Sequence, residues 1–457
     1  MAGTTAAGTP PVRRPRALPP RPRPWPRLVP AAVHLLGWTG AVAVLALWWS
    51  DTTAVVGAGD WISGAGRIAG LLAGYTCAVL VVLMARVPWL DRTVGTDRLA
   101  RWHAAAGRYT VSLVVAHALL IVWGYSLTGH TGVVHQTVLV LHYPEMLKAT
   151  AAFALFLLTA VVSARAARRR LGYETWHYLH LLTYAAIFLS FGHVLANGAE
   201  FVGNRGAQAL WYALYLGAAG LVGWFRVLVP LRAARRHRLR VAGVRQEGPG
   251  VVSVLVTGER LDRLAARPGQ FFRWRFLARG LWWTASPYSL SAPAGPHGLR
   301  ITVKAVGSHS AALARLRPGT RVWAEGPYGA LTAQRARSRR TLLLAGGVGI
   351  TPLRALFETL PGDPVLIYWA RTPDDLVLRR ELDEVAAARG ARVHYSVGRP
   401  AGHALPLTAA TLASLVPDVA HRDVYLCGPP GMTEAAHRAL RAAGVPRSRV
   451  HHESFAL

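Results

Sequence analysis

The chain has 457 residues, of which 52% are hydrophobic, and a formal net charge of +30. It is too long for one ordinary domain and too apolar for a wholly soluble protein, so we expect part of it to lie in a lipid bilayer. The charge comes almost entirely from arginine, because Lys148 and Lys304 are the only lysines. Since Ala, Gly, Val and Pro are also abundant, this indicates a G+C-rich genome rather than nucleic-acid binding. The only cysteines, Cys77 and Cys427, exclude a disulfide framework and a cysteine-ligated zinc site.

The first half of the chain contains six apolar segments, each close to the roughly 20 residues that a helix needs to cross a bilayer. They cover residues 31–50, 62–85, 106–127, 148–164, 177–196 and 207–226. Residues 31–230 are therefore predicted to form a six-helix transmembrane domain. Residues 1–30 are basic and Pro-rich without a cleavable signal pattern, and we expect a disordered tail there.

Arginine distribution predicts the orientation in the membrane. Arginines gather before the first segment, in the second and fourth loops and after the sixth segment. The other three loops hold only Arg205 and, at the border of the fourth segment, Lys148. By the positive-inside rule, both termini and the whole second half face the cytoplasm, which predicts a multi-pass plasma-membrane protein.

The second half changes character at about residue 236. Short β-type runs such as VVSVLVTG and LRITVKAVG, broken by Gly and Pro, predict a β-rich domain over 236–335. Over 340–457, buried strands such as TLLLAGG and DVYLCG alternate with helical stretches, which predicts an α/β domain.

Histidines recur in two of the apolar segments. His103 and His117 are 14 positions apart in the third, so they lie on nearly one helix face with a rise of about 21 Å between them. The fifth segment, which runs in the same direction, offers His180 and His193 at matching depths. Their 13-residue step leaves an ideal helix about 140° out of phase, so we expect a kink or a wide turn between them. His177 is an alternative to His180 and is no better in phase.

Paired imidazoles at two depths of a membrane predict two bis-histidine b-type hemes. Two imidazole ligands per iron leave no open coordination position, which suits electron transfer, and histidines in hydrocarbon are costly and usually functional. The predicted ligands are His103, His117, His180 and His193, and Arg67 and Arg108 are candidates for pairing with propionates. Each histidine could instead be a hydrogen-bonded core residue, and each arginine could extend to the membrane surface.

A flavin motif follows in SPYSLSAP, residues 286–293. It resembles the Arg-x-Tyr-Ser/Thr motif of the ferredoxin-NADP reductase family, with Ser286 in place of the arginine. The resemblance implies an antiparallel β-barrel FAD domain in which Tyr288 covers the isoalloxazine and Ser289 approaches its polar edge. PGQF, VGSHS and EGPYG are also similar to that family, and Gly307 and Ser310 of VGSHS belong to the segment that donates backbone N–H groups to the FAD pyrophosphate.

The stretch LLLAGGVGITPLRAL, residues 342–356, predicts a dinucleotide site. A strand ends in a glycine-rich turn and leads into a helix, so Gly346, Gly347, Gly349 and Thr351 could let a diphosphate approach the backbone and the helix N-terminus. A tight strand–helix turn without a ligand is the alternative. Arg371 and Arg399 could hold a 2′-phosphate, which favours NADPH over NADH.

The whole of residues 31–457 resembles the ferric reductase and NADPH oxidase superfamily. That resemblance implies a Rossmann-like NAD(P) domain in which Cys427 and Gly428 lie by the nicotinamide, and a flavin shielded by Phe455. Electrons would pass from NAD(P)H through FAD and two hemes to an external acceptor. A ferric chelate is the first candidate, superoxide formation from oxygen the second, and delivery to a partner protein the third. A transporter with a regulatory nucleotide domain would require a heme-free protein.

The third loop is the candidate site for that acceptor. His130, His135, His142 and Glu145 could bind ferric iron there. The alternative is a polar surface loop with scattered histidines.

Overall fold

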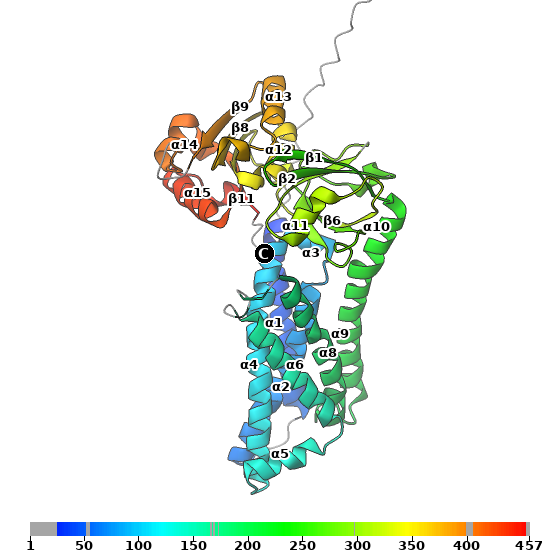
Figure 1. Ribbon diagram of the computed structural model, residues 1–457. Helices are drawn as coiled ribbons and strands as arrows, with labels where there is room; N and C mark the ends of the chain where they lie inside the picture. The colour runs from blue at the N-terminus through cyan, green and yellow to red at the C-terminus, as the bar shows by residue number, and fades with distance from the viewer. Residues whose placement is uncertain are drawn as a thin grey trace, which may run out of the picture. The chain divides into compact units, whose positions relative to one another are not determined.

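The computed structural model describes residues 25–51, 55–164, 167, 170–171, 173–296, 298–398 and 405–453. Residues 1–24 of the predicted tail lie outside this part of the chain. Two compact units are present, one formed by Pro24–Arg235 and one that includes Arg236–Leu457 (Figure 1). Each unit is described by itself.

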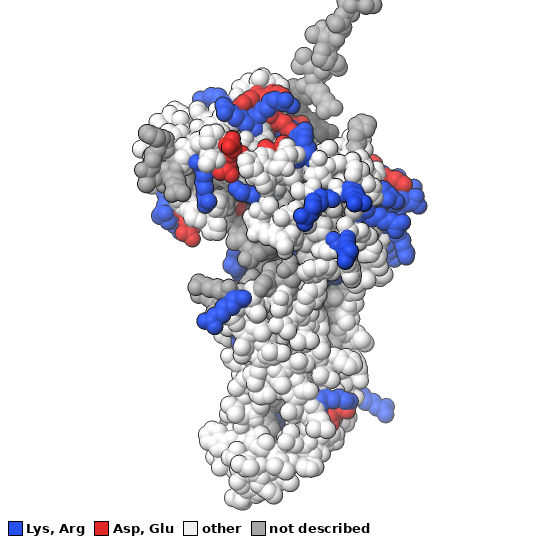
Figure 2. Space-filling model, in the orientation of Figure 1, with Lys and Arg blue, Asp and Glu red and all other residues white. Residues whose placement is uncertain are grey.

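The first unit is helical. Its elements are α1 (Trp25–Asp51), α2 (Ala58–Leu83), α3 (Pro88–Thr93), α4 (Thr96–Thr128), α5 (Val133–Leu141), α6 (Met146–Ser163), α8 (Tyr173–Asn197), α9 (Arg205–Val222), the π-helix η1 (Gly223–Leu228) and α10 (Val229–His237). Among the described residues, six helical stretches are long and apolar enough to cross a membrane, which confirms the six predicted spans. The face of this unit seen in Figure 2 carries few charged side chains, as a lipid-facing surface requires.

Small residues bring α2 and α4 together. A side chain on Gly66 would lie 3.0–3.1 Å from Ile121, and one on Gly124 would lie 2.5 Å from the Ser63 hydroxyl. Contact between helices in lipid brings no hydrophobic stabilisation, because the surrounding lipid tails are equally apolar. Membrane helices therefore associate through close approach of their backbones, which small residues allow. The contact between α2 and α4 and the contact between α6 and α8 are the two most extensive in the unit, and Figure 1 shows these helices alongside one another.

The structure differs in detail from two expectations about this unit. The helix α8 continues as an α-helix from Tyr173 to Asn197, so of the two expected irregularities the wide turn is absent between His180 and His193. A wide turn is present in the sixth span instead, as η1. The third loop is also not simply a polar loop, because α5 fills much of it with the sequence VVHQTVLVL and buries Val140.

The second unit begins with two three-stranded antiparallel sheets. Their strands are β1 (Arg240–Gly248), β2 (Val251–Thr257), β3 (Phe271–Phe276), β4 (Ser286–Ser289), β5 (Leu299–Lys304) and β6 (Val322–Tyr328). The sheet orders are β1-β2-β5 and β4-β3-β6, and isolated bridges from Arg240 to Arg321 and from Leu290 to Ile301 join the sheets at two corners. Phe272, Trp274 and Ile301 are fully buried between them. The expected antiparallel β-domain is thus present, as two sheets joined by these bridges.

A five-stranded parallel sheet in the order β11-β10-β7-β8-β9 completes the unit. Its strands are β7 (Arg340–Gly346), β8 (Asp363–Ala370), β9 (Arg392–Val397), β10 (Asp423–Cys427) and β11 (Val450–His452), and its helices are α12 (Ile350–Thr359), α13 (Arg379–Arg389), α14 (Ala409–Leu415) and α15 (Pro430–Ala442). Alternate residues of β7 pack into cores on opposite faces, with Leu343 on the side of α12 and α13 and Leu342 on the side of α14 and α15. The strand order reverses between β7 and β10. In such sheets, ligands bind at the carboxyl ends of the strands beside that reversal.

Candidate functional site

Four of the predicted histidines form two facing pairs between α4 and α8. The ring centroids of His103 and His180 are 6.0 Å apart, and those of His117 and His193 are 6.2 Å apart. Two side chains 140° apart on α8 can both reach α4 because each then lies about 70° from the line that joins the helices. His177 lies instead against Trp176 and Tyr178, with ring centroids 6.3 and 6.1 Å away.

Backbone carbonyls orient the α4 member of each pair. His103 Nδ1 lies 3.2 Å from the Leu80 carbonyl oxygen, and His117 Nδ1 lies 2.8 Å from the Gly66 carbonyl oxygen. Since a carbonyl only accepts, each Nδ1 carries the proton and donates it, which leaves the Nε2 lone pair as the metal-binding atom. The carbonyls therefore act as the hydrogen-bond partners that fix ring orientation in histidine metal sites.

The α8 member of each pair has a polar neighbour. Ser163 Oγ lies 3.3 Å from His180 Nδ1. Asn197 Nδ2 lies 3.3 Å from His193 Nδ1 and donates to the Pro144 carbonyl at 2.6 Å. This second contact ties the end of α8 to the segment before α6.

The separation of the rings fits one metal ion between them. A bond from a metal to an imidazole nitrogen is about 2 Å, so two rings on opposite sides of one ion have centroids roughly 6 Å apart. No cluster of three or more His, Cys, Asp or Glu side chains suited to a metal occurs in the described part of the chain. A group that needs only two protein ligands, such as a b-type heme, fits the ring separation of each pair. A ferric-iron site in the third loop receives no support from the described residues.

Arg67 has a protein partner that the sequence did not reveal. Its Nε and one terminal nitrogen donate to Glu200 Oε1 at 2.9 and 2.6 Å, and Glu200 is 2% exposed in the connection between α8 and α9. Arg67 follows Gly66, whose carbonyl holds His117, so this ion pair lies next to the 117/193 pair. Arg108 is exposed on α4.

The flavin segment, residues 286–293, runs through β4 into the next turn. Tyr288 is partly buried against the core of the two sheets, and burial raises the pKa of its phenol although a hydrogen bond with Ser286 opposes this. The Ser289 hydroxyl is buried without a hydrogen-bond partner in the described residues, as a group awaiting a ligand would be. Ser286 Oγ lies 3.4 Å from His309 Nδ1, which brings the flavin segment and VGSHS together.

The VGSHS turn uses its serine internally. Ser310 Oγ accepts from the backbone N–H groups of Val306 and Gly307 at 2.9 and 3.1 Å and donates to the Gly307 carbonyl. The Gly307 N–H is thus already bonded within the turn, and any donation to a pyrophosphate falls to the N–H groups that follow it in α11 (Ser308–Ala312).

The two glycine-rich turns meet at the carboxyl edge of the parallel sheet, where Ala345 of β7 lies opposite Cys427 of β10. A side chain on Gly346 would overlap Met432, one on Gly349 would overlap the Cys427 carbonyl, and one on Gly428 would lie 2.8 Å from the Met432 sulfur. Packing therefore accounts for these three glycines. Gly347 differs, because it has φ +52° and open space where its side chain would be, so it is the position that a diphosphate could approach.

Thr351 lies in the first turn of α12, at the expected helix N-terminus. Arg371 is exposed just after β8, while Arg399 and Phe455 lie outside the described residues. Cys427 is fully buried, and burial, with the Glu453 carboxylate adding to it, raises the pKa of its thiol well above the ordinary value. The thiol is therefore neutral and can line the site without acting as a nucleophile.

Comparisons with known proteins agree with both halves of the chain. Residues 69–191 match the family described as "Ferric reductase like transmembrane component", and residues 343–438 match "Oxidoreductase NAD-binding domain". The glycine betaine monooxygenase reductase subunit of Chromohalobacter salexigens is 30% identical over 236 residues, 48% of this chain and 64% of that protein. An NADPH oxidoreductase of Mycobacterium tuberculosis is 30% identical over 265 residues, 54% of this chain and 69% of that protein. The chain thus spans just under two thirds of the length of the first of these relatives.

Among solved structures, flavohemoglobin from Malassezia yamatoensis is 18% identical with a TM-score of 0.45, over 86% of this chain and 99% of that one.

The fold and these matches define a multi-pass membrane oxidoreductase with an FAD- and NAD(P)-binding reductase module. A ferric reductase-like transmembrane component followed by that module matches the ferric reductase and NADPH oxidase type of fusion protein.

Proposed function

We propose that this protein passes electrons from cytoplasmic NAD(P)H, through FAD and two bis-histidine b-type hemes, to an acceptor outside the plasma membrane. The observation that carries the proposal is a pair of imidazoles at each of two levels between α4 and α8. The ring centroids are 6.0 Å apart in one pair and 6.2 Å apart in the other. Bound FAD would convert a two-electron hydride into single electrons, and bis-histidine heme would accept them one at a time without binding oxygen at iron.

The residues of the membrane unit have distinct roles in this proposal. His103 and His180 hold one heme near the cytoplasmic side, and His117 and His193 hold the other near the outer side. The carbonyls of Leu80 and Gly66 fix the ligating tautomer on α4. Because all four rings lie on helices that are each packed against another helix, α4 on α2 and α8 on α6, rather than on loops, the ligand geometry is set before any cofactor binds.

In the reductase module, Tyr288 and Ser289 contact the flavin, and Gly347 with the N-terminus of α12 receives the dinucleotide diphosphate. Cys427 and Gly428 lie by the nicotinamide, Phe455 shields the flavin, and Arg371 and Arg399 select NADPH by its 2′-phosphate. The domains assigned to these roles are the FAD-binding domain at 236–335 and the NAD(P)-binding domain at 340–457.

A ferric chelate is the acceptor we put first, and superoxide formation from oxygen is the alternative for the same electron path. A second function, electron delivery to a partner protein, is favoured by one observation. Two of the relatives, the glycine betaine monooxygenase and 3-ketosteroid-9-alpha-monooxygenase proteins, are reductase components by name. Rapid NADPH oxidation by the purified protein with ferric citrate or oxygen alone would favour the enzyme. Its absence despite intact hemes would favour a missing partner.

Histidine substitutions test the path across the membrane. In right-side-out and inverted vesicles, His193→Leu should lose one heme and nearly stop reduction of an impermeant outer acceptor. NADPH oxidation with a soluble dye on the cytoplasmic side should survive, because the flavin chemistry does not use that histidine. His180→Leu should block outward transfer equally while removing the other heme's signal. A parallel fall of both activities at unchanged heme content would mean that these histidines are packing residues.

A further inference from the structure

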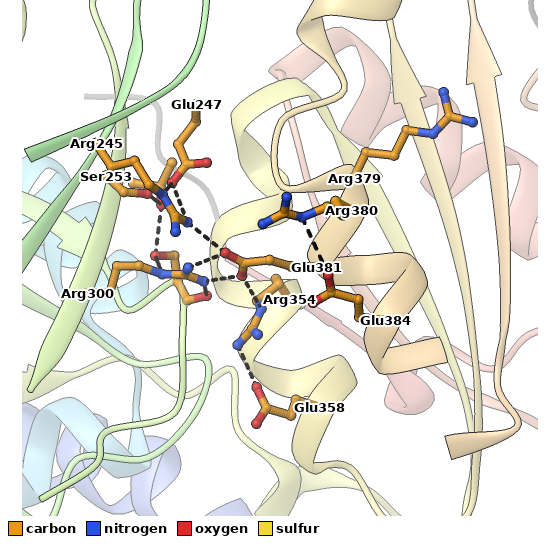
Figure 3. Close-up of polar contacts among 12 residues, drawn as sticks. Arg245, Glu247, Ser253, Arg300, Arg354, Glu358, Arg379, Arg380, Glu381 and Glu384 are labelled. Atoms are coloured by element: carbon orange, nitrogen blue, oxygen red, sulfur yellow. Dashed lines mark hydrogen bonds and ion pairs between the residues drawn. The ribbon is translucent and has the colours of Figure 1, made fainter. Parts of the chain in front are cut away.

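A network of ion pairs, partly buried around Glu381, joins the two parts of the reductase module (Figure 3). At its centre is Glu381, in the first turn of α13, with its side chain 19% exposed. Arg300 of β5 donates to both Glu381 oxygens, at 2.6 and 2.8 Å. Arg245 of β1 donates to one of them at 2.7 Å, and Arg354 of α12 lies 3.2 Å from the other. One carboxylate of the α/β domain is therefore held by two strands of the FAD-binding domain.

Arg300 also donates hydrogen bonds to the flavin segment. Its Nε donates to Ser291 Oγ at 3.1 Å, and one of its terminal nitrogens donates to the Ser291 carbonyl at 2.8 Å. Ser291 lies two residues after Ser289, within residues 286–293. Thr302 donates to the same Ser291 hydroxyl at 2.8 Å. Arg300, a residue that is only 9% exposed, thus bonds the flavin segment and the α/β domain with one guanidinium.

We propose that Arg300 and Glu381 are positioning residues for hydride transfer, which hold the flavin segment and the NAD(P)-binding domain in register. Two parallel hydrogen bonds between the planar guanidinium and the carboxylate fix the distance and the angle between Arg300 and Glu381. The rate of hydride transfer depends steeply on how the nicotinamide is placed against the flavin, since a misplacement of about 1 Å can cost on the order of 100-fold in rate. Both side chains are bonded to protein groups, namely Ser291 and each other, so their assigned role is geometry rather than chemistry.

The other contacts of the network suggest a matched control. Arg354 also pairs with Glu358, four residues along the same helix. Glu358 is more exposed than Glu381 and belongs to the same domain as its partner, so Glu358→Gln removes a carboxylate from the network without cutting the connection between domains. A second connection between the domains, Lys304 to Asp375 at 3.0 Å, remains in every variant.

The test uses the full-length protein in detergent and measures, anaerobically and in a single turnover, how fast NADPH reduces the bound FAD. In Glu381→Gln the rate per bound FAD should fall roughly 10- to 100-fold, while FAD content and the KM for NADPH in dye reduction change little. The charge-transfer absorbance between flavin and nicotinamide should weaken. Arg300→Lys keeps the charge but loses the fork, so an intermediate rate is expected. Glu358→Gln should match the wild type.

Glu381→Gln leaves Arg300 buried without its carboxylate and could lower stability, so a double variant separates geometry from folding. Replacing a buried ion pair by apolar residues is often neutral or stabilising. Arg300→Met with Glu381→Leu should keep the fold, because Arg245 and Arg354 retain their other partners, Glu247 and Glu358. We expect NADPH to reduce the FAD of this double variant as slowly as it reduces that of Glu381→Gln. A double variant that regains both thermal stability and the wild-type rate would overturn it, as would a wild-type rate per FAD in Glu381→Gln. The inference rests on the reductase half of the proposed function alone: a protein that reduces FAD but contains no heme would defeat the electron path and leave this test intact.

Discussion

Gly70 provides a steric test of the 117/193 pair. It lies on α2 against the His117 ring, and a side chain at this position would lie 2.6 Å from His117 Nδ1 and 2.8 Å from Cε1. Ordinary contact begins near 3.4 Å, so Gly70→Ala should push the ring about 0.8 Å away (3.4 − 2.6). That movement strains the 2.8 Å bond from Nδ1 to the Gly66 carbonyl, which sets the ligating tautomer.

The size of the effect follows from the cost of overpacking. Inserting a methyl group into a packed interior typically costs about 1–3 kcal/mol, which corresponds to roughly a 5- to 150-fold loss of heme affinity if the strain is relieved when the heme leaves. Transfer of heme from the detergent-solubilised protein to excess apomyoglobin measures this loss. In Gly70→Ala one of two heme fractions should leave much faster than in the wild type.

Gly217 is the matched control. It lies on α9 rather than on α4 or α8, which carry the histidines, and nothing lies within 4 Å of where its side chain would be. Gly217→Ala should therefore retain both hemes and stabilise the helix by about 1 kcal/mol. Equal heme release from Gly70→Ala, Gly217→Ala and the wild type would refute the placement of a heme at His117.

Two further predictions concern the reductase module. Replacing Arg371 and Arg399 together by alanine should raise the KM for NADPH roughly 10-fold or more and leave the KM for NADH nearly unchanged, since each charge-assisted bond to a phosphate contributes about 1.5–3 kcal/mol; equal effects on the two coenzymes would assign the arginines another role. Burial raises the pKa of Glu381, but its hydrogen bonds with Arg300 and the neighbouring positive charges prevail and lower the pKa from 4.5 to about 2. Its stabilising contribution should be complete above about pH 4.5 and disappear as the pH falls towards 2, so the acid-induced fall in melting temperature should be shallower in Glu381→Gln than in the wild type.

The spans and the histidine pairing could be predicted because both follow from local sequence. Twenty apolar residues suffice to predict a membrane helix, and a step of 14 residues places His103 and His117 on one face whatever surrounds them. The prediction of a wide turn in α8 was wrong for a related reason. That prediction assumed that His180 and His193 must lie on one face of their helix. In the structure they lie on either side of the line from α8 to α4, and both reach α4 from there.

The charged partners could not be predicted, because tertiary structure selects them. Arg67 needs a counter-charge in the membrane, but nothing near it in sequence points to Glu200, 133 residues later. Arg300 and Glu381 are 81 residues apart and belong to a strand and a helix of different domains. A buried arginine predicts that a carboxylate partner exists, and only the fold identifies it.

The amount of heme in the purified, full-length protein tests the electron path most directly. Two facing histidine pairs predict two b-type hemes for each FAD, measured as pyridine hemochrome against extracted flavin. The reduced-minus-oxidised spectrum should be that of six-coordinate heme at both sites. A ratio near two supports the account, whereas a folded, FAD-containing protein with one heme would remove one histidine pair from it, and one with none would contradict it altogether.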